Sequence, residues 1–498
     1  MNKKAVLNSL PFLFLFFIIQ FFSGCSKIKV VNYVCVSDGL FADYFSLHET
    51  EKSETAELNF ISTSDFTKLK SENPLTINKV AAVITEEKNI SLEENKSELN
   101  KEYFVLDSTP YVPSSPVNFE TPGDKLNSLL EPEFSVAVTK PEELPQNSRA
   151  FPVNGRYCDD ENYSLTVKNC AAVTYLDSSL KNEIQAECKK VFHNELTQEK
   201  SSENKIAFVA NVGDIMVARG VEDILINDDD GAEKIFGSTL KVLQNNHLTM
   251  GNLEGVVTGS TKNAIKTYTF KFKKEVLPVL KKCGFNYFMI TNNHCYDFGE
   301  DGFKDTLNAL KEFDIPTSGA GFNKDEAEKF YYTQINGQTF AVISCGAYPI
   351  ERSGFNGEKT AVAGENKAGI LWKSDSLLEK VKAESEKGNV VLVNVHGGQE
   401  YVFSPDKNQQ AFYKSLIDSG ASIVYGSHPH VLQPAQWYNG GLIIYSMGNF
   451  LFNGMEEMHG AQESEIVRIG FFRNKPLYFE IYPAKLNGKY VSLKQVFS

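Results

Sequence analysis

Short apolar runs alternate with amphipathic stretches between residues 206 and 482, and this alternation constrains the fold more than any other feature of the chain. The apolar runs are Ile206–Val212, His247–Met250, Tyr287–Thr291, Phe340–Ser344, Val390–Val395, Ser422–Tyr425 and Leu442–Ser446. Helical patterns lie near residues 233–244, 274–282, 301–313, 374–386 and 406–418. Strands buried on both faces form continuous apolar runs, and their alternation with helices predicts a layered α/β core. Two later runs, Ile466–Phe472 and Leu477–Tyr482, predict antiparallel strands that close the sheet.

Polar side chains follow these predicted strands at their carboxyl ends, where ligands bind in α/β sheets. The residues at these positions are Asp214, Asn252, Glu254, Asn293, His294, Asp297, His396, Glu400, Tyr401, His428, His430, Ser446 and Asn449. They include four of the eight histidines of the chain.

Each of these residues taken alone has a structural explanation. An Asp after a Gly is usually a turn residue or a helix cap, and a single His after a strand more often makes a structural hydrogen bond. The pair His428 and His430 favours a metal more strongly, because imidazole suits first-row divalent ions. Carboxylate, amide oxygen and imidazole at one sheet edge together predict a site for one or two Mn²⁺, Fe²⁺ or Zn²⁺ ions.

The motifs that contain these residues resemble the CapA family of poly-γ-glutamate capsule proteins over residues 206–455. In order, they are Gly213-Asp-Ile-Met, Asn252-Leu-Glu-Gly, Asn292-Asn-His-x-x-Asp-x-Gly, His396-x-Gly-x-Glu-Tyr, Gly426-Ser-His-Pro-His and Tyr445-Ser-Met-Gly-Asn-Phe. That family is related in fold to the calcineurin-like metallophosphoesterases. The resemblance therefore implies a four-layer α/β/β/α sandwich with a two-metal site between its sheets.

Carried over residue by residue, the resemblance implies a role for each side chain. The implied metal ligands are Asp214 and His430 at the first ion, Glu254 as a bridge, and Asn293, His396 and His428 at the second ion. His294 would donate a proton to the leaving group. Asp297 would be its partner, although Asp297 suits equally well the cap of a helix that begins near Asp301. The implied pocket or substrate contacts are Asn252, Glu400, Tyr401 and Asn449, and a purely structural turn is an equal alternative for Asn449.

The sequence departs from the family pattern at two positions. Met216 stands where related phosphoesterases have a metal-binding histidine, which leaves the first site with fewer ligands. Gly397 stands where the family commonly has Trp, which predicts a wider or less aromatic substrate groove.

Two functions from different classes follow from these motifs. The first is a metal-dependent hydrolase, in which a metal-bound water of lowered pKa attacks a phosphoester or a γ-glutamyl amide and His294 protonates the leaving atom. The alternative is a non-catalytic lipoprotein that binds or anchors an anionic surface polymer in a capsule-synthesis and export assembly. A third hypothesis is a two-domain sensor whose first domain binds a small solute.

The N-terminus predicts export and a lipid anchor. Lys3 and Lys4 precede an apolar run from Leu10 to Phe22, which is short for a membrane span and suits a signal peptide of residues 1–24. The sequence Ser23-Gly24-Cys25 resembles a bacterial lipobox, which implies cleavage before Cys25 and lipidation of its sulfur. An uncleaved membrane anchor is the alternative. Both place the body of the protein outside the cytoplasm, in the periplasm or at the cell surface.

The residues between the export signal and residue 206 predict a separate unit. Residues 25–193 are expected to form a smaller α/β accessory domain of unknown ligand, and residues 194–205 a polar linker. Residues 150–157 resemble part of a lobe of periplasmic solute-binding proteins. Proline, serine and threonine crowd residues 109–122, which predicts a loop there.

The charge balance argues against nucleic acid as a partner. The chain of 498 residues has a net charge of −13, and no basic stripe offsets this charge. The contacts to phosphate that drive nucleic-acid binding are therefore missing. An anionic substrate would need a bound cation to supply local positive charge.

Overall fold

The computed structural model divides the chain into two compact units. It describes residues 205–494 without a break, residues 149–160, and elsewhere in the first 204 residues chiefly the backbone of strands β1–β8. One unit consists of residues 1–111 and 153–201, and the other of residues 112–152 and 202–498.

The strands described in the first unit form one sheet with the order β1-β2-β3-β8-β4. They are β1 (Phe14–Phe21), β2 (Lys29–Ser37), β3 (Leu58–Thr63), β4 (Asn100–Pro110) and β8 (Thr166–Tyr175). Strand β1 lies within the predicted signal peptide, whose cleavage stays a prediction. Cys25 and residues 194–204 of the predicted linker lie outside the described residues.

The boundary between the units differs from the one that we expected from the sequence. Residues 112–152, which we assigned to the accessory domain, belong to the C-terminal unit. Strand β5 (Val112–Pro116) pairs with β6 (Ala137–Thr139) and β7 (Ser148–Ala150), and β7 pairs with β24 (Lys475–Asn487) of the C-terminal domain. The prediction of a loop was wrong for residues 112–116, because they form β5 and strand pairing satisfies their backbone. Residues 117–122 lie outside the described residues.

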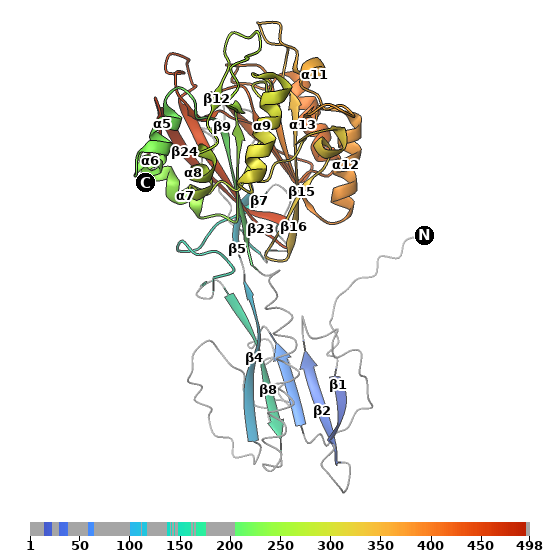
Figure 1. Ribbon diagram of the computed structural model, residues 1–498. Helices are drawn as coiled ribbons and strands as arrows, with labels where there is room; N and C mark the ends of the chain where they lie inside the picture. Colours follow the sequence, from blue (N-terminus) through green and yellow to red (C-terminus); the bar gives the residue numbers. More distant parts are fainter. Residues whose placement is uncertain are drawn as a thin grey trace. The chain divides into compact units, whose positions relative to one another are not determined.

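The C-terminal domain contains two large sheets with helices outside each of them (Figure 1). The first sheet has the order β13-β10-β9-β23-β24-β7-β5-β6, with β22 also beside β9 and β25 beside β24. The second has the order β15-β16-β18-β19-β21-β20. The remaining strands of the first sheet are β9 (Ala207–Met216), β10 (Leu248–Leu253), β13 (Tyr287–Met289), β22 (Asn449–Phe452), β23 (Glu463–Phe472), β24 (Lys475–Asn487) and β25 (Tyr490–Leu493). Those of the second are β15 (Tyr331–Ile335), β16 (Gln338–Ala347), β18 (Val390–Gly397), β19 (Ile423–Ser427), β20 (Leu432–Tyr438) and β21 (Gly441–Met447).

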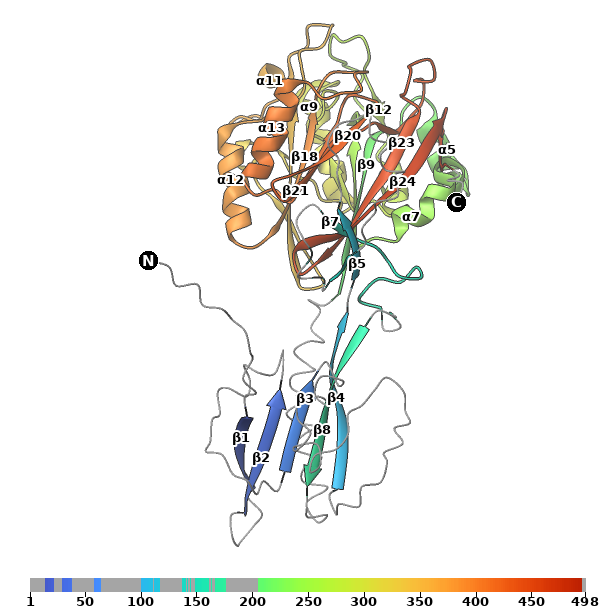
Figure 2. The same ribbon diagram turned by 180° about the vertical axis from the view of Figure 1, so that it is seen from behind.

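Helices cover the outer face of each sheet, as the two opposite views show (Figures 1 and 2). Those packed on the first sheet are α5 (Val221–Asn227), α6 (Gly231–Phe236), α7 (Leu240–Gln244), α8 (Val276–Lys282) and α9 (Gly299–Glu312). Those packed on the second are α12 (Asp375–Glu386) and α13 (Lys407–Asp418). The helix predicted over residues 233–244 is interrupted at Gly237, whose φ of +46° ends α6 before a short 3₁₀ turn leads into α7.

Three apolar clusters hold the layers together. Successive side chains of a strand face opposite sides of its sheet. In β18, Val390 and Leu392 therefore pack between the two sheets, whereas Val391 and Val393 pack against the helices outside. Strand β9 divides its residues in the same way between the inner cluster and the helices of the first sheet. The four-layer α/β/β/α fold expected from the sequence is confirmed.

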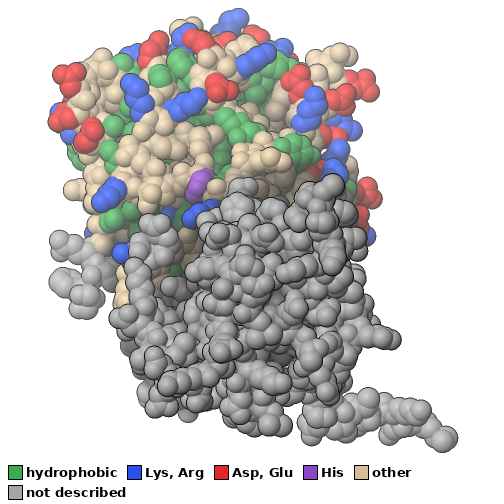
Figure 3. All heavy atoms as spheres, turned by 90° about the horizontal axis from the view of Figure 1, so that it is seen from below, with side chains coloured by type: hydrophobic (Ala, Val, Ile, Leu, Met, Phe, Trp, Pro, Cys, Tyr) green, Lys and Arg blue, Asp and Glu red, His purple; other side chains and the backbone are tan. Residues whose placement is uncertain are grey.

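No helix in the described residues is both long enough and apolar enough to cross a bilayer. On the face seen in Figure 3, lysine and arginine side chains are intermixed with aspartate and glutamate. The described part of this face therefore presents charges of both signs.

Polar side chains replace apolar ones at one end of the space between the sheets. The inner face of β18 continues from Leu392 to Asn394 and His396, which are all buried. Asn211 of β9 donates a hydrogen bond from Nδ2 to Asn394 Oδ1 across the two sheets, at 2.8 Å. The alternation of side chains that places Leu392 in the apolar core thus also places Asn394 and His396 on the same inner face, toward the carboxyl end of β18.

We expect Asn211→Leu to lower the free energy of unfolding by about 1–3 kcal/mol, because it leaves the Asn394 carbonyl oxygen buried without a donor. The double variant Asn211→Leu/Asn394→Leu should lose less than the sum of the two single variants, since the polar pair is then removed as a unit. Urea unfolding followed by circular dichroism measures all three values. Strictly additive losses would contradict a stabilising contact between the sheets.

Candidate functional site

Two carboxylates lie fully buried at the carboxyl ends of β9 and β10. Neither Asp214 nor Glu254 has exposed surface. Asn252 connects them, because its Nδ2 donates to Asp214 Oδ1 at 2.8 Å and lies 3.1 Å from Glu254 Oε2. The other oxygen of Glu254, Oε1, has no hydrogen-bond partner in the described residues. Burial, followed by the charge of Asp214, raises the pKa of Glu254 well above its ordinary value.

A close approach of two backbone segments fixes the position of Asp214. A Cβ atom at Gly213 would overlap the carbonyl oxygen of Gly448, so only glycine lets the turn before β22 approach β9 this closely. The Asp214 N–H then donates to that same carbonyl oxygen at 3.0 Å. Asn449 follows directly and lies opposite Asp214 in the register of β22 and β9.

His430 contacts both carboxylates from the turn after β19. Its Nδ1 lies 3.2 Å from Asp214 Oδ2 and 2.9 Å from Asn449 Oδ1, and its Nε2 lies 3.9 Å from Glu254 Oε1. Burial lowers the pKa of His430, but the Glu254 and Asp214 charges outweigh burial and raise this pKa to about 9. The turn is strained, with φ of +98° at His428 and +59° at His430.

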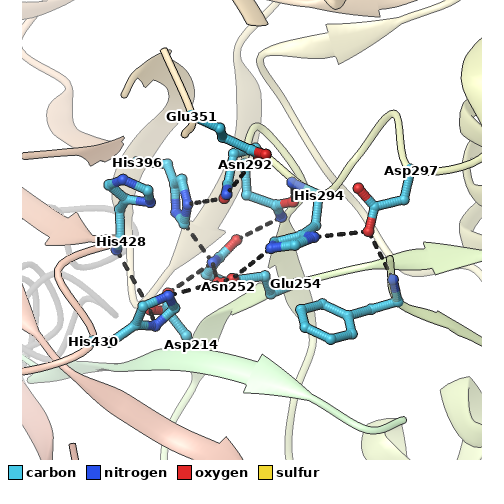
Figure 4. Close-up of polar contacts among 12 residues, drawn as sticks. Asp214, Asn252, Glu254, Asn292, His294, Asp297, Glu351, His396, His428 and His430 are labelled. Carbon is cyan, nitrogen blue, oxygen red and sulfur yellow. Dashed lines mark hydrogen bonds and ion pairs between the residues drawn. The ribbon is translucent and has the colours of Figure 1, made fainter. Parts of the chain in front are cut away.

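A second group of imidazole and amide side chains lies beside the carboxylates (Figure 4). His396 Nε2 lies 2.9 Å from Asn293 Oδ1, and His396 Nδ1 lies 2.9 Å from Ser427 Oγ. The ring of His428 has its centroid 4.8 Å from that of His396, and neither of its buried nitrogens has a hydrogen-bond partner in the described residues. Burial lowers the pKa of both histidines well below the ordinary value. Both are therefore held neutral, which is the form that binds metals.

These residues fit a divalent metal. One ligand atom from each of Asp214, Glu254 and His430 lies within 4.8 Å of the others. Among the unpartnered atoms, Glu254 Oε1 and one ring nitrogen of the neutral His428 imidazole have a lone pair available for an ion. A buried polar atom without a partner costs about 1–3 kcal/mol, which a bound cation would offset. Carboxylate, imidazole and amide oxygen together suit Mn²⁺, Fe²⁺ or Zn²⁺.

The two groups correspond to the two predicted metal positions. Asp214, Glu254 and His430 would hold one ion, and the side chains that would hold a second are Asn293, His396 and His428. Met216 belongs to neither group, because its side chain is buried in a separate apolar cluster with Phe270 and Phe452.

His294 lies next to the carboxylates and is paired with a buried carboxylate of its own. Its Nδ1 lies 2.7 Å from Asp297 Oδ2, and its Nε2 lies 3.9 Å from Glu254 Oε1 (Figure 4). Asp297 also accepts hydrogen bonds from Lys266 Nζ and the Phe270 N–H, both at 2.7 Å. Because Asp297 accepts hydrogen bonds from three donors, the proton between it and His294 lies on His294 Nδ1. The other ring nitrogen, Nε2, faces the candidate metal ligands. Burial lowers the pKa of His294, and the Asp297 charge opposes this shift.

The two alternatives for Asp297 are distinguished by its contacts. Helix α9 begins after Phe298, and no side chain caps its first turn. The carboxylate of Asp297 instead contacts His294, Lys266 and the backbone of Phe270.

Lys266, whose side chain has no exposed surface, was not predicted from the sequence. Its Nζ lies 2.7 Å from Asp297 Oδ1, 2.8 Å from Glu351 Oε1 and 2.8 Å from the Asn293 carbonyl oxygen. Glu351 in turn accepts a hydrogen bond from Asn293 Nδ2 at 3.1 Å, which turns Asn293 Oδ1 toward His396. No motif surrounds Lys266, and the excess of acidic groups in the predicted site was the one signal that a buried cation was needed.

The residues expected to contact substrate lie at different depths. Asn252 and Asn449 are buried and position the carboxylates and His430. Tyr401 is half-buried, with its ring centroid 5.8 Å from that of His430. Glu400 is exposed at the surface beside them.

Comparison with known proteins identifies the family of this chain. The profile of the bacterial capsule synthesis protein PGA_cap matches residues 208–454, which include every residue of the candidate site. The PGA biosynthesis protein CapA of Bacillus subtilis is 32% identical over 292 residues, which are 58% of this chain and 74% of that protein. The chain belongs to the PGA_cap family. The capsule biosynthesis protein CapA of Bacillus anthracis, another similar protein, is 35% identical over 58% of this chain and 69% of its own length.

Solved structures resemble this PGA_cap protein more loosely. A phosphatase from Mycoplasma pneumoniae aligns with 56% of this chain and 93% of its own, at 13% identity and a TM-score of 0.36. A hypothetical protein from Thermus thermophilus aligns with 56% of this chain and all of its own, at the same identity and TM-score. Likeness at this level says nothing about activity.

We expect Mn²⁺ or Zn²⁺ to raise the Tm of the protein, because an ion that binds only the folded state stabilises it, by about 2.7 kcal/mol at a hundredfold excess over Kd. Asp214→Asn should remove most of this increase and most of the metal retained after gel filtration. His459→Ala, a change at an exposed histidine outside the group, should leave both unchanged. Equal metal content in Asp214→Asn and wild type would contradict the proposed ligands.

Proposed function

We propose that this PGA_cap protein is a metal-dependent hydrolase that cleaves a bond in an anionic capsule or cell-envelope polymer. The observation that carries the proposal is the His294–Asp297 pair beside the buried metal-binding side chains. Metal ligands alone would also suit a structural ion. A histidine with one nitrogen fixed by a carboxylate and the other facing the ligands is an arrangement for acid–base catalysis.

The residues of the chain divide the chemistry among them. A divalent ion held by the ligand group would supply an electrophile that activates water near neutral pH. His294 Nε2 takes up the proton that the attacking water loses and passes it to the leaving atom, and Asp297 stabilises the imidazolium while it is charged. Lys266 keeps Asp297 in place by holding its second oxygen. Because the site lies between two sheets, most of its side chains are already removed from water. Substrate binding therefore costs little further desolvation or rearrangement of these side chains.

The bond that we favour is the γ-glutamyl amide of poly-γ-glutamate. Its support is the name of the Bacillus subtilis relative, a PGA biosynthesis protein, together with the motifs of the capsule family. A phosphoester is the second candidate, supported by the resemblance of the motifs to metallophosphoesterases. Both substrates are anionic, and both need the charge of a cation at the site.

We also propose that the domain works outside the cytoplasm, attached to the membrane through a lipid at Cys25, within an assembly that makes or exports capsule polymer. The support is the apolar run and lipobox-like sequence at the N-terminus. A Cys25→Ser variant should then move from the detergent phase to the aqueous phase of a Triton X-114 extract. Equal partition of variant and wild type would contradict the anchor.

We expect His294→Asn to lower kcat by about 10²–10⁴-fold while metal content stays at the wild-type level, because it removes a proton donor and no ligand. Asp297→Asn should also lower kcat, since it no longer fixes the proton at Nδ1. Turnover of poly-γ-glutamate and of a phosphodiester by the Mn²⁺-loaded full chain measures this, with His459→Asn as the control.

Failure of the metal-loaded protein to turn over either substrate would contradict the hydrolase and leave the non-catalytic polymer binder. Wild-type turnover by His294→Asn would contradict the role of this histidine alone.

A further inference from the structure

Arg219 lies close to the catalytic histidine on the exposed side of the site. It follows β9, and its Cζ lies 4.9 Å from the ring centroid of Phe270 and 5.7 Å from that of Tyr268. The ring centroid of Phe270 lies 4.3 Å from that of His294. One aromatic ring therefore contacts both the guanidinium and the imidazole.

Arg219 is held in a fixed position although it is exposed. Its backbone has a φ of +55°, a value that residues other than glycine rarely adopt. Asn453 stabilises this conformation through two reciprocal hydrogen bonds, from Asn453 Nδ2 to the Arg219 carbonyl at 2.9 Å and from Arg219 Nη1 to the Asn453 carbonyl at 2.8 Å. Because the guanidinium is already oriented, a ligand that binds it loses less conformational entropy.

The outer edge of this guanidinium is available for a ligand. Its bonds to the carbonyls of Asn453 and Gly454 use Nη1 alone. Among the described residues, Nε and Nη2 of Arg219 have no hydrogen-bond partner. These two nitrogens form the planar edge that binds a carboxylate or phosphate through two parallel hydrogen bonds.

The other cation near His294 cannot serve this purpose. Lys266 is buried and already has Asp297 and Glu351 as charged partners. Arg219 has no ion pair with any described residue. Burial raises the pKa of Tyr401, and the charge of Arg219 opposes this shift. The ring of Tyr401 in turn contacts that of His430. An anionic group that enters the site from the side of His294 would therefore meet Arg219 first.

We propose that Arg219 binds the carboxylate next to the leaving atom of the substrate and thereby selects γ-linked glutamate. The proposal rests on the proposed hydrolase, because it places the leaving atom at His294. In a γ-linked chain, the amide nitrogen is bonded to a carbon that bears a free α-carboxylate. A guanidinium that shares an aromatic ring with His294 is placed to hold this carboxylate while the nitrogen lies at the imidazole.

Equilibrium binding of two γ-linked oligomers tests the assignment without any turnover. One is a glutamate oligomer, and the other carries α-carboxamides in place of α-carboxylates. In full-length, Mn²⁺-loaded His294→Asn protein, the carboxylate oligomer should bind about tenfold or more tightly than the carboxamide, as expected for a charge-assisted bidentate contact. Adding Arg219→Gln should reduce this preference to about twofold or less, whereas Arg219→Lys should retain part of it.

Two controls separate binding from folding. Arg473→Gln removes the same charge far from the site. Arg473 lies in the turn after β23, close to Phe471, which pairs with the first residue of β9, and the site lies at the other end of β9. This variant should keep the full preference. Asn453→Ala keeps the guanidinium and its backbone acceptors but removes the hydrogen bond that supports the positive φ of Arg219, and should lose part of the preference. An unchanged preference in Arg219→Gln, or none in the parent protein, would overturn the assignment. Because hydrolysis is not measured, failure here is distinct from failure of the proposed hydrolase.

Discussion

The buried charge of Asp214 and Glu254 is the constraint on which the rest of the site depends. Both carboxylates lie between two apolar sheets with no exposed surface, where an uncompensated charge costs several kcal/mol. Asn252 and His430 supply part of the compensation, and Glu254 Oε1 remains without a partner in the described residues. The tight contact at Gly213 and the strained turn at His428 and His430 hold these groups in place. A divalent ion bound by Asp214, Glu254 and His430 would compensate the remaining charge.

The need to compensate negative charge also explains why Lys266 and Arg219, the two cations near His294, differ in burial and in pairing. The side chain of Lys266 is completely buried and paired, so its contribution is to position Asp297 and Asn293. Arg219 is exposed and oriented by backbone contacts that leave its outer edge free among the described residues. A buried, satisfied cation positions the His294–Asp297 pair, and an exposed, oriented cation suits the anionic substrate that we propose.

The strand positions and the main site residues could be predicted from the sequence because both follow from local periodicity. Runs such as Val390–Val395 mark buried strands, and a polar residue directly after them, such as His396, must lie at the sheet edge. Lys266 and Arg219 could not be found in this way, because their partners Asp297 and Asn453 come from distant loops. The addition of β5 to the first sheet was also missed, since its pairing with β6 and β7 leaves no periodic pattern in a proline-rich segment.

Anomalous diffraction at the manganese edge, from crystals of the full chain grown with Mn²⁺, shows whether the buried carboxylates hold a metal. We expect one peak at about 2.0–2.2 Å from oxygen or nitrogen atoms of Asp214, Glu254 and His430. A second peak beside His396 and His428 would establish two ions. Ordered carboxylates without any peak between them, or peaks only at exposed acidic side chains, would show that Asp214, Glu254 and His430 do not form a metal site.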